Sequence, residues 1–243
     1  MSVQAGRGDP GRGSLPKYIQ ISEMLIRRIA AGQLADGTRL PPEREMAQGL
    51  GIAVGTLRKA LADLDEKGLL HRVQGSGNYI RTRPEVASLY AFFRLERVEG
   101  GGLPTAEVLS LDLMGKPSDA PDFGPSTLAH RIRRLRRLDG ETVALEEIWL
   151  DASHAQAIAA GELVESLYLY YRRALGLVIT RAEDRVGAAP MPDWTPPAAP
   201  LPAGATAGFI TRLAWAQTGA RAEYSRTWFD SEKAVYVNRM GRG

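Results

Sequence analysis

Two groups of residues in this 243-residue sequence have side chains suited to binding an anion. The first lies between residues 40 and 80, where exposed basic positions on two short predicted helices precede a Gly75-Ser76-Gly77 turn. Arginine and lysine at such positions can contact DNA phosphates or base edges. The candidate DNA-binding residues are Arg44, Thr56, Arg58, Lys59, Gly75, Ser76 and Gly77. The alternative is that these side chains are ordinary solvated residues of a small helical domain.

The second group lies in the C-terminal half. Arg134 and Arg136 are two positions apart on a predicted strand, so their side chains emerge from the same face. Two guanidinium groups placed close together can hold a phosphate or a carboxylate. Ser166 begins a predicted helix whose free amides favour an anion, and Tyr168 adds a hydroxyl. The alternatives are a solvated basic edge for the arginines and plain helix capping for Ser166.

Two carboxylates accompany this second group. Glu146 and Glu223 each lie on the second strand of a predicted hairpin, among apolar residues. They could accept hydrogen bonds from sugar hydroxyls or from an amine. The competing interpretation is that both are surface carboxylates.

The elements that must position the first group follow from punctuating residues. Pro41 and Pro42 suit the first position of a helix that opens near Glu43, and glycines at 49 and 51 end it. A second helix starts near Val54 with leucines at helical spacing, and Gly68 ends it. A hairpin with the 75–77 turn follows. Helix, turn, helix and β-hairpin together predict a winged helix-turn-helix, whose second helix enters the DNA major groove.

After residue 88 the pattern changes from helices to strands. A strand is predicted over 106–114, and hairpins over 131–150 and 209–229 turn at Asp139-Gly140 and Thr218-Gly219. The two hairpins resemble each other, either through an internal duplication or because hairpins of one sheet share composition. A helix is predicted over 166–175 and a final strand over 234–240. Residues 189–208 hold six of the 15 prolines and predict an extended loop.

Composition limits the class of protein. The sequence has no cysteine and three scattered histidines (His71, His130 and His154), so we expect no disulfide and no metal or other cofactor. Neither a secretory signal nor a membrane span is evident, which predicts a cytoplasmic protein without a membrane partner. Residues 1–84 carry 13 Lys/Arg and 8 Asp/Glu, whereas residues 85–243 carry 18 and 20. The basic N-terminal part suits a phosphate-backbone partner.

Residues 15–80 resemble the DNA-binding domain of the GntR family of bacterial transcription regulators. The segments LPPEREMA, TLRKALADLDEKGLL and RVQGSGNYI carry the resemblance. It implies that Arg44 and Arg58 contact bases or phosphates, that Thr56 anchors the recognition helix and that Gly75 lets the wing enter the minor groove. Members commonly have Ser or Thr and then Arg where this chain has Ala53-Val54-Gly55. The operator sequence therefore cannot be transferred from relatives.

From Leu89 onward the chain resembles the UTRA effector-binding domain of the HutC branch of that family. The segments RRLRRLDGETVALEEIWL, ESLYLYYRRALGLVITRAED and ARAEYSRTWF carry this resemblance. It implies a fold shared with chorismate lyase and an effector pocket at the matching positions. Those positions are Arg134, Arg136, Glu146, Ser166, Tyr168, Arg181, Glu223 and Phe229, with Arg181 and Phe229 matching less closely.

The sequence therefore predicts an α+β protein with a disordered tail (1–14), a winged helix-turn-helix domain (15–81), a linker (82–88) and an antiparallel-sheet UTRA domain (89–243). We expect a homodimeric repressor, not an enzyme, that binds a near-palindromic double-stranded operator. A small anionic effector, such as a sugar phosphate or a carboxylate, would release it. The alternatives are a chorismate-lyase-like enzyme fused to a DNA-binding module, and a nucleoid-binding module without an effector.

Overall fold

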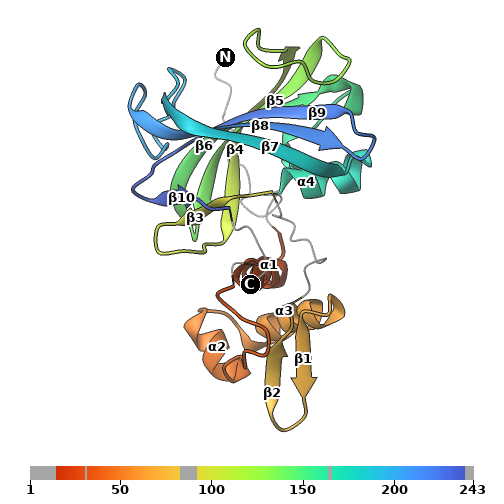
Figure 1. Cartoon of the computed structure of the whole chain (residues 1–243), viewed down its shortest axis with the longest axis vertical. Coiled ribbons are helices and arrows are strands. Elements are labelled where there is room, and N and C mark those ends of the chain that lie inside the picture. Colours follow the sequence, from red (N-terminus) through yellow and green to blue (C-terminus); the bar gives the residue numbers. More distant parts are fainter. Residues whose placement is uncertain (1–14, 31, 83–91, 164–165, 239–243) are drawn as a thin grey trace, which may run out of the picture.

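The computed structural model describes residues 15–30, 32–82, 92–163 and 166–238. Within these ranges a small helical domain is followed by a larger domain built on an antiparallel sheet (Figure 1). This arrangement confirms the predicted α+β class. The predicted tail lies outside the described residues, as does the predicted linker except for its first residue.

The helical domain has three helices. They are α1 (Lys17–Ala30), α2 (Glu43–Gly49) and α3 (Val54–Glu66). Leu25, Leu57 and Leu61 come from α1 and α3 and are almost fully buried in one shared core. Gly51, at φ +62°, makes the turn between α2 and α3, a conformation that side-chain-bearing residues rarely adopt. The predicted helix-turn-helix is therefore present.

The predicted wing is also present. Strands β1 (Leu70–Val73) and β2 (Gly77–Ile80) pair antiparallel, with Leu70 opposite Ile80 and Val73 opposite Gly77. Leu70 and Ile80 are buried at the base of the hairpin, whereas its tip projects away from the larger domain (Figure 1). The tip is thus held on a packed base and remains open to a partner.

The larger domain contains a six-stranded antiparallel sheet in the order β4-β5-β6-β9-β8-β7. Its strands are β4 (Pro104–Gly115), β5 (Leu128–Leu138), β6 (Glu141–Asp151), β7 (Ile179–Pro190), β8 (Thr206–Ala216) and β9 (Arg221–Phe229). Both predicted hairpins are confirmed as β5–β6 and β8–β9. Strand β7 was not predicted, and its last two residues lie where the sequence suggested a loop.

Pairing at the centre of the sheet is symmetric. Glu146 of β6 pairs with Thr227 of β9, and Ile148 pairs with Ser225. If Arg134 is matched to Arg212, as the similarity of the hairpins suggests, then Glu146 corresponds to Ser225 and Ile148 to Thr227. Each central pair is then the image of the other across the β6–β9 boundary. This register supports the duplication hypothesis.

A short helical segment covers one face of the sheet. It consists of α4 (Leu167–Tyr170) and the π-helical turn η3 (Tyr171–Leu175), followed by Gly176 at φ +64°. The predicted continuous helix over 166–175 is therefore divided in two. Tyr171 and Leu167 pack against Ile132, Ile148 and Leu150, which project from this face. Single turns η1 (Ala152–His154) and η2 (Ala160–Glu162) precede the segment.

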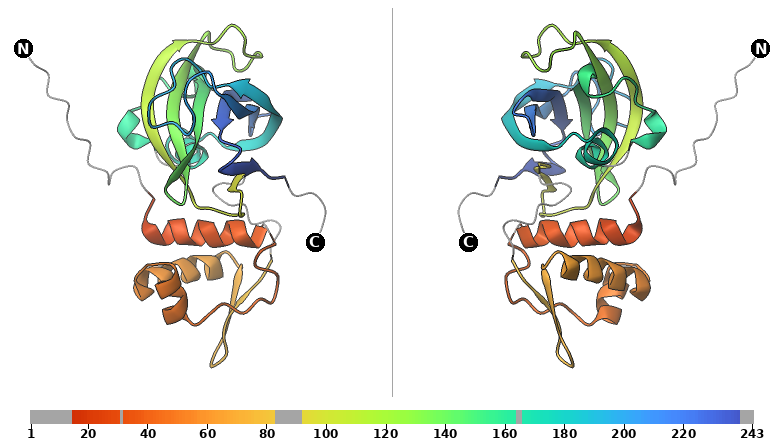
Figure 2. Two further views of the ribbon diagram at one scale, coloured as in Figure 1. Left: turned by 90° about the vertical axis from the view of Figure 1, so that its left-hand side faces the viewer. Right: turned by 90° about the vertical axis from the view of Figure 1, so that its right-hand side faces the viewer.

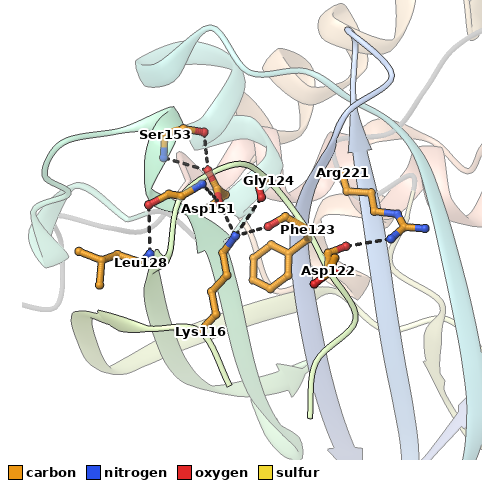
Figure 3. A network of polar contacts seen from close by, with 9 residues as sticks. Lys116, Asp122, Phe123, Gly124, Leu128, Asp151, Ser153 and Arg221 are labelled. Carbon is orange, nitrogen blue, oxygen red and sulfur yellow. Dashed lines mark hydrogen bonds and ion pairs between the residues drawn. The ribbon is translucent and has the colours of Figure 1, made fainter. Parts of the chain in front are cut away.

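Irregular segments cover the opposite face. The proline-rich segment places Met191 and Trp194 against Leu135 and Trp228, so it seals a second core instead of lying free on the surface. A second irregular segment, between β4 and β5, is held in place by Asp151. The Asp151 carboxylate accepts bonds from Lys116 Nζ at 2.6 Å and from Ser153 N at 3.0 Å (Figure 3). Gly124 is required there, because a Cβ would lie 2.1 Å from the Asp151 carboxyl carbon.

Helix α1 lies between the rest of the helical domain and the sheet domain (Figure 2). On the sheet side it meets a two-stranded sheet formed by β3 (Leu95–Arg97) and β10 (Ala234–Tyr236). The predicted final strand thus begins at the expected residue but ends at Tyr236, so residues 237 and 238 are not part of it, and its predicted last two residues lie outside the described part. Leu15 and Ile19 also pack with Leu169 of α4. These contacts tie the two domains together.

Candidate functional site

The candidate DNA-binding residues lie on one outer surface of α2, α3 and the wing. Arg44, Arg58 and Lys59 are exposed, and Thr56 is half-buried at the first turn of α3. Arg58 Nε lies 2.7 Å from Glu43 Oε2, so the recognition-helix arginine is paired with a carboxylate of α2. The structure brings the predicted basic residues together on the surface that α3 presents.

The wing turn has the backbone that its glycines predict. Gly75 and Gly77 have φ of +75° and +130°, and Ser76 Oγ lies 2.6 Å from Tyr79 Oη. Arg39 was not among the predicted DNA-binding residues, yet its exposed side chain lies beside Gly77. A Cβ at position 77 would lie 3.3 Å from Arg39 Nε. A small residue at position 77 therefore leaves room for an additional cation beside the wing.

A pocket of about 90 Å³ lies on the helix-covered face of the sheet domain. Alternate residues of four adjacent strands reach this face, which is why Arg134, Arg136 and Glu146 meet there. Its lining consists of Phe92, Phe93, Arg94, Leu95, Arg134, Arg136, Glu146, Ile148, Ser166, Leu167, Tyr168, Ile210, Arg212, Glu223, Ser225 and Thr227. The volume admits several water molecules, so polar ligand groups can enter.

Arg134 and Arg136 form a buried cluster with Glu146. Arg134 Nε lies 2.6 Å from Glu146 Oε2, and Arg136 Nη2 lies 3.1 Å from the same oxygen. Burial alone would raise the pKa of Glu146, but the two guanidinium groups outweigh burial and hold that pKa below its usual value. The alternative interpretation, a solvated basic edge, is therefore wrong for these two arginines, which are 5% and 3% exposed.

Glu223 lies on the other half of the pocket in a different environment. Tyr171 Oη donates to Glu223 Oε2 at 2.7 Å, and Tyr168 Oη donates to Oε1 at 3.0 Å. Burial raises the pKa of Glu223, and these hydrogen bonds oppose that rise only in part. Burial and the nearby carboxylate also raise the pKa of both tyrosines, so both remain donors. The competing surface-carboxylate interpretation is wrong for both Glu146 and Glu223.

Arg212 lines the pocket but was not among the predicted effector residues. Its Nε and Nη2 atoms each lie 2.6 Å from an oxygen of Asp184, which also accepts a 2.8 Å bond from Tyr236 Oη. Burial, with Asp184 next in importance, raises the pKa of Tyr236 to about 12. The similarity of the two hairpins was the signal that could have found Arg212, because it corresponds to Arg134 in that alignment.

Six of the eight predicted effector residues line the pocket, and Arg181 and Phe229 do not. Arg181 lies on edge strand β7, where its guanidinium carbon is 4.2 Å from the Trp215 ring centroid and its side chain is 64% exposed. Phe229 is on the pocket face of β9 but packs in a neighbouring core. Its ring lies against Gly208, so a Cβ at position 208 would overlap the Phe229 ring. The resemblance to the UTRA domain thus identified the strands near the pocket, but these two side chains do not line it.

Ser166 has the predicted capping role but not the predicted helix behind it. Its Oγ accepts a 3.4 Å bond from Leu169 N, and α4 spans only four residues. So short a helix has little of the aligned dipole that would attract an anion. Ser166 lines the pocket through its own side chain rather than as the start of a long helix.

No group of three or more His, Cys, Asp or Glu side chains among the described residues is arranged to hold a metal ion. None of their helices is both long and apolar enough to cross a membrane.

Comparison with known families decides the class of protein. Residues 17–80 match the model for bacterial regulatory proteins of the gntR family, and residues 100–234 match the UTRA domain. The chain belongs to the GntR family of regulators. It is therefore a transcription regulator with a DNA-binding domain and a UTRA effector domain, and its relatives are regulators and not enzymes.

Individual relatives agree with this assignment. The HTH-type transcriptional regulator SmoD of Agrobacterium fabrum is 58% identical over 94% of this chain and 97% of its own length. The mannosyl-D-glycerate transport/metabolism system repressor MngR of Escherichia coli is 28% identical over 72% of this chain and 75% of its own. The structure of YydK from Bacillus subtilis matches with a TM-score of 0.51 at 21% identity, over 93% of this chain and all of that one, and supports the fold.

Proposed function

We propose that this regulator is a homodimeric repressor that releases its operator when a small anionic metabolite occupies the pocket. The observation that carries this proposal is the charge of the pocket lining. Four arginines (94, 134, 136 and 212) are accompanied by three carboxylates, because Asp184 pairs with Arg212 in addition to Glu146 and Glu223 of the lining, and Glu223 has a raised pKa. A ligand that brings one or two negative charges balances this lining better than a neutral ligand does.

A sugar phosphate or a carbohydrate carboxylate fits these residues. Guanidinium groups bind phosphate and carboxylate oxygens in paired geometry, and Glu223 with its two tyrosines is placed to meet hydroxyl groups. The relative MngR is named as a repressor of a transport and metabolism system for mannosyl-D-glycerate, which is an anionic carbohydrate. Both features support the same assignment for this chain.

On DNA, the dimer would place two copies of α3 in successive major grooves. The operator would then be a near-palindrome whose half-sites lie about 34 Å apart, one helical turn. Arg44, Thr56, Arg58 and Lys59 would contact bases or phosphates, and the 75–77 turn would enter the minor groove. Arg39, beside Gly77, adds a further positive charge to that wing.

Footprinting on the DNA upstream of the protein's own gene tests this proposal. The full chain should protect a near-palindromic site. Glucose 6-phosphate and related sugar phosphates, glycerate glycosides and simple carboxylates are then added, with the matching neutral sugars as controls. Release by an anionic member and not by its neutral partner is the expected result. Two outcomes would contradict the anionic-effector assignment. One is equal release of the operator by the neutral sugars, and the other is that no anionic compound either releases the operator or binds the protein in calorimetry.

A further inference from the structure

Helix α1 touches the same two segments that line the pocket. Leu15, which lies just before the helix, and Ile19, in its first turn, pack with Leu169 of α4, whose neighbours Leu167 and Tyr168 are pocket residues. Towards its C-terminal end, Arg27 reaches the 93–95 segment, which also lines the pocket. The DNA-binding domain is therefore in contact with the pocket wall at both ends of one helix.

Arg27 is the polar part of this contact. Its Nη2 donates a 2.9 Å hydrogen bond to the backbone carbonyl of Leu95, and its guanidinium carbon lies 5.0 Å from the ring centroid of Phe93. Leu95 is 2% exposed and begins β3, so the accepting carbonyl belongs to a fixed strand. The bond joins residues that lie 68 positions apart in the chain.

Arg136 contacts the same ring from the pocket side of the chain. Its guanidinium carbon lies 4.8 Å from the Phe93 centroid, while its Nε and Nη2 face Glu146 at 3.3 and 3.1 Å. Phe93 thus shares contacts with one arginine of the DNA-binding domain and with one arginine of the effector cluster. Both distances fall within the range in which a cation is attracted to an aromatic face.

We propose that Arg27, Phe93 and Arg136 form a bridge through which pocket occupancy controls the docking of α1, with Arg27 as the positioning residue on the DNA-binding side. This inference rests on the proposed function, because it assumes that an anion is drawn to Arg136. The bridge gives the ligand the differential contact that a conformational switch requires, since a ligand that interacts equally with both arrangements shifts neither.

The physical step is competition for one guanidinium group. Arg136 is attracted both to Glu146 and to the Phe93 ring. An arriving anion takes hydrogen-bond donors from Arg136 and neutralises its charge, so the attraction of Arg136 for the ring falls. The Phe93 ring is then held less firmly from the pocket side, which weakens its contact with Arg27.

Hydrogen exchange of the full chain, read in α1 and in residues 93–97, tests the bridge without a known effector. Arg136→Gln should speed exchange in α1 roughly two- to fivefold, the size expected for one cation–π contact. The same substitution in an Arg27→Gln background should add nothing at α1, because the bridge is already broken. Matched controls are Arg133→Gln, on the opposite face of β5, and Arg28→Gln, next to Arg27 on α1; each should leave α1 unchanged.

A ligand arm uses inorganic phosphate against chloride at equal ionic strength. Phosphate should speed α1 exchange in the wild type and have no such effect in Arg27→Gln, although both proteins bind it equally by calorimetry. The proposed bridge is wrong if Arg136→Gln leaves hydrogen exchange in α1 unchanged, or if its effect on that exchange persists without Arg27. It is also wrong if phosphate binds without changing hydrogen exchange in α1. Failure of phosphate to bind at all would count against the proposed function instead, and the mutant cycle would still decide the bridge.

Discussion

Arg134 and Arg136 together neutralise the buried carboxylate of Glu146, so these three side chains depend on one another. Removing both arginines alone would leave Glu146 buried without a cation, and breaking a buried pair in this way costs about 3–5 kcal/mol. A loss of response in that double variant would not separate binding from folding. The carboxylate has to be removed together with its partners.

The variant Arg134→Met/Arg136→Met/Glu146→Leu keeps similar volumes and leaves no orphaned charge. Each lost charge-assisted hydrogen bond is worth about 1.5–3 kcal/mol, so affinity for an anionic ligand should fall by at least roughly tenfold. Calorimetric titration with inorganic phosphate and sugar phosphates measures this change. Arg133→Met, whose guanidinium faces Glu147 and Trp194 on the other side of the sheet, is the control and should bind normally. Unchanged affinity in the triple variant would place the anion elsewhere.

The two pocket glutamates should respond to pH with opposite signs. Glu223 has a raised pKa in the folded chain, so the stability linked to it is present below its unfolded pKa and is lost as pH rises through the folded value. Glu146 has a depressed pKa, so its contribution is present above the unfolded pKa and is lost as pH falls through the folded value.

Glu223→Gln should therefore raise the melting temperature at neutral pH, by about 2–4 °C for each kcal/mol gained, and this advantage should shrink towards pH 4. Glu146→Gln should lower it at neutral pH, because two buried arginines lose their shared carboxylate. Thermal melts across pH measure both. The same sign of change in the two variants would show that the environments of these carboxylates have been misassigned.

On the DNA-binding surface, Glu43 holds Arg58 in the absence of DNA. Arg58→Ala should cost about 1–3 kcal/mol of operator binding if the side chain reads a base, with relaxed preference at that position. Glu43→Gln should instead strengthen binding, because it releases the guanidinium and removes a negative charge that faces the phosphates. Electrophoretic titrations on matched and mutated half-sites distinguish these outcomes. If operator affinity changes in neither variant, this surface is not the one that contacts DNA.

At the scale of elements, the wing depends on a backbone conformation more than on packing. Gly75 has φ of +75°, and no atom lies within 4 Å of where its Cβ would stand. Gly75→Val should weaken operator binding, because a branched side chain resists positive φ and blocks close approach to the groove. Circular dichroism should show the domain still folded. Intact affinity would mean that the hairpin does not enter a groove.

Elements with local signals were predictable, and elements that depend on tertiary contacts were not. Glycine and proline punctuation predicted α2, α3, the wing and both hairpins, because turn chemistry is encoded within a few residues. Strand β7 was missed since its exposed, charged residues lack apolar alternation; it is held by pairing with β8. The division of the 166–175 helix into α4 and η3 likewise depends on packing over the sheet.

Part of the pocket lining was predictable from local patterns. The spacing of two positions on one strand predicted that Arg134 and Arg136 share a face, and their places on the second strands of the two hairpins identified Glu146 and Glu223 as candidates. Phe93 and Arg94 could not be found, because their segment reaches the pocket only through the pairing of β3 with β10. Nor could the sequence show that Asp184 holds Arg212, since that contact crosses from β7 to β8.

At the scale of the whole molecule, the two edges of the large sheet differ in character. Edge strand β7 exposes Arg181, Glu183 and Arg185, and charged side chains on an edge discourage further pairing. At the other edge, β4 and the adjoining end of β5 expose Leu109, Leu113, Met114 and Leu128, each at least 38% accessible. The charged side chains of β4, Glu107 and Asp112, are each paired with an arginine of β5, so the free side of this edge is mainly apolar and is suited to pairing with another chain.

The proposed homodimer should therefore form through β4. Antiparallel pairing of β4 with its copy creates a two-fold axis, which matches the symmetry of a near-palindromic operator. Leu113→Lys, placing a charge on that edge, should convert the dimer to monomer in light scattering and reduce cooperative operator binding, while Val186→Lys on β7 should change neither. Val186 is 53% and Leu113 51% exposed, so the two substitutions are matched in accessibility. A Leu113→Lys protein that remains dimeric would place the interface on another surface.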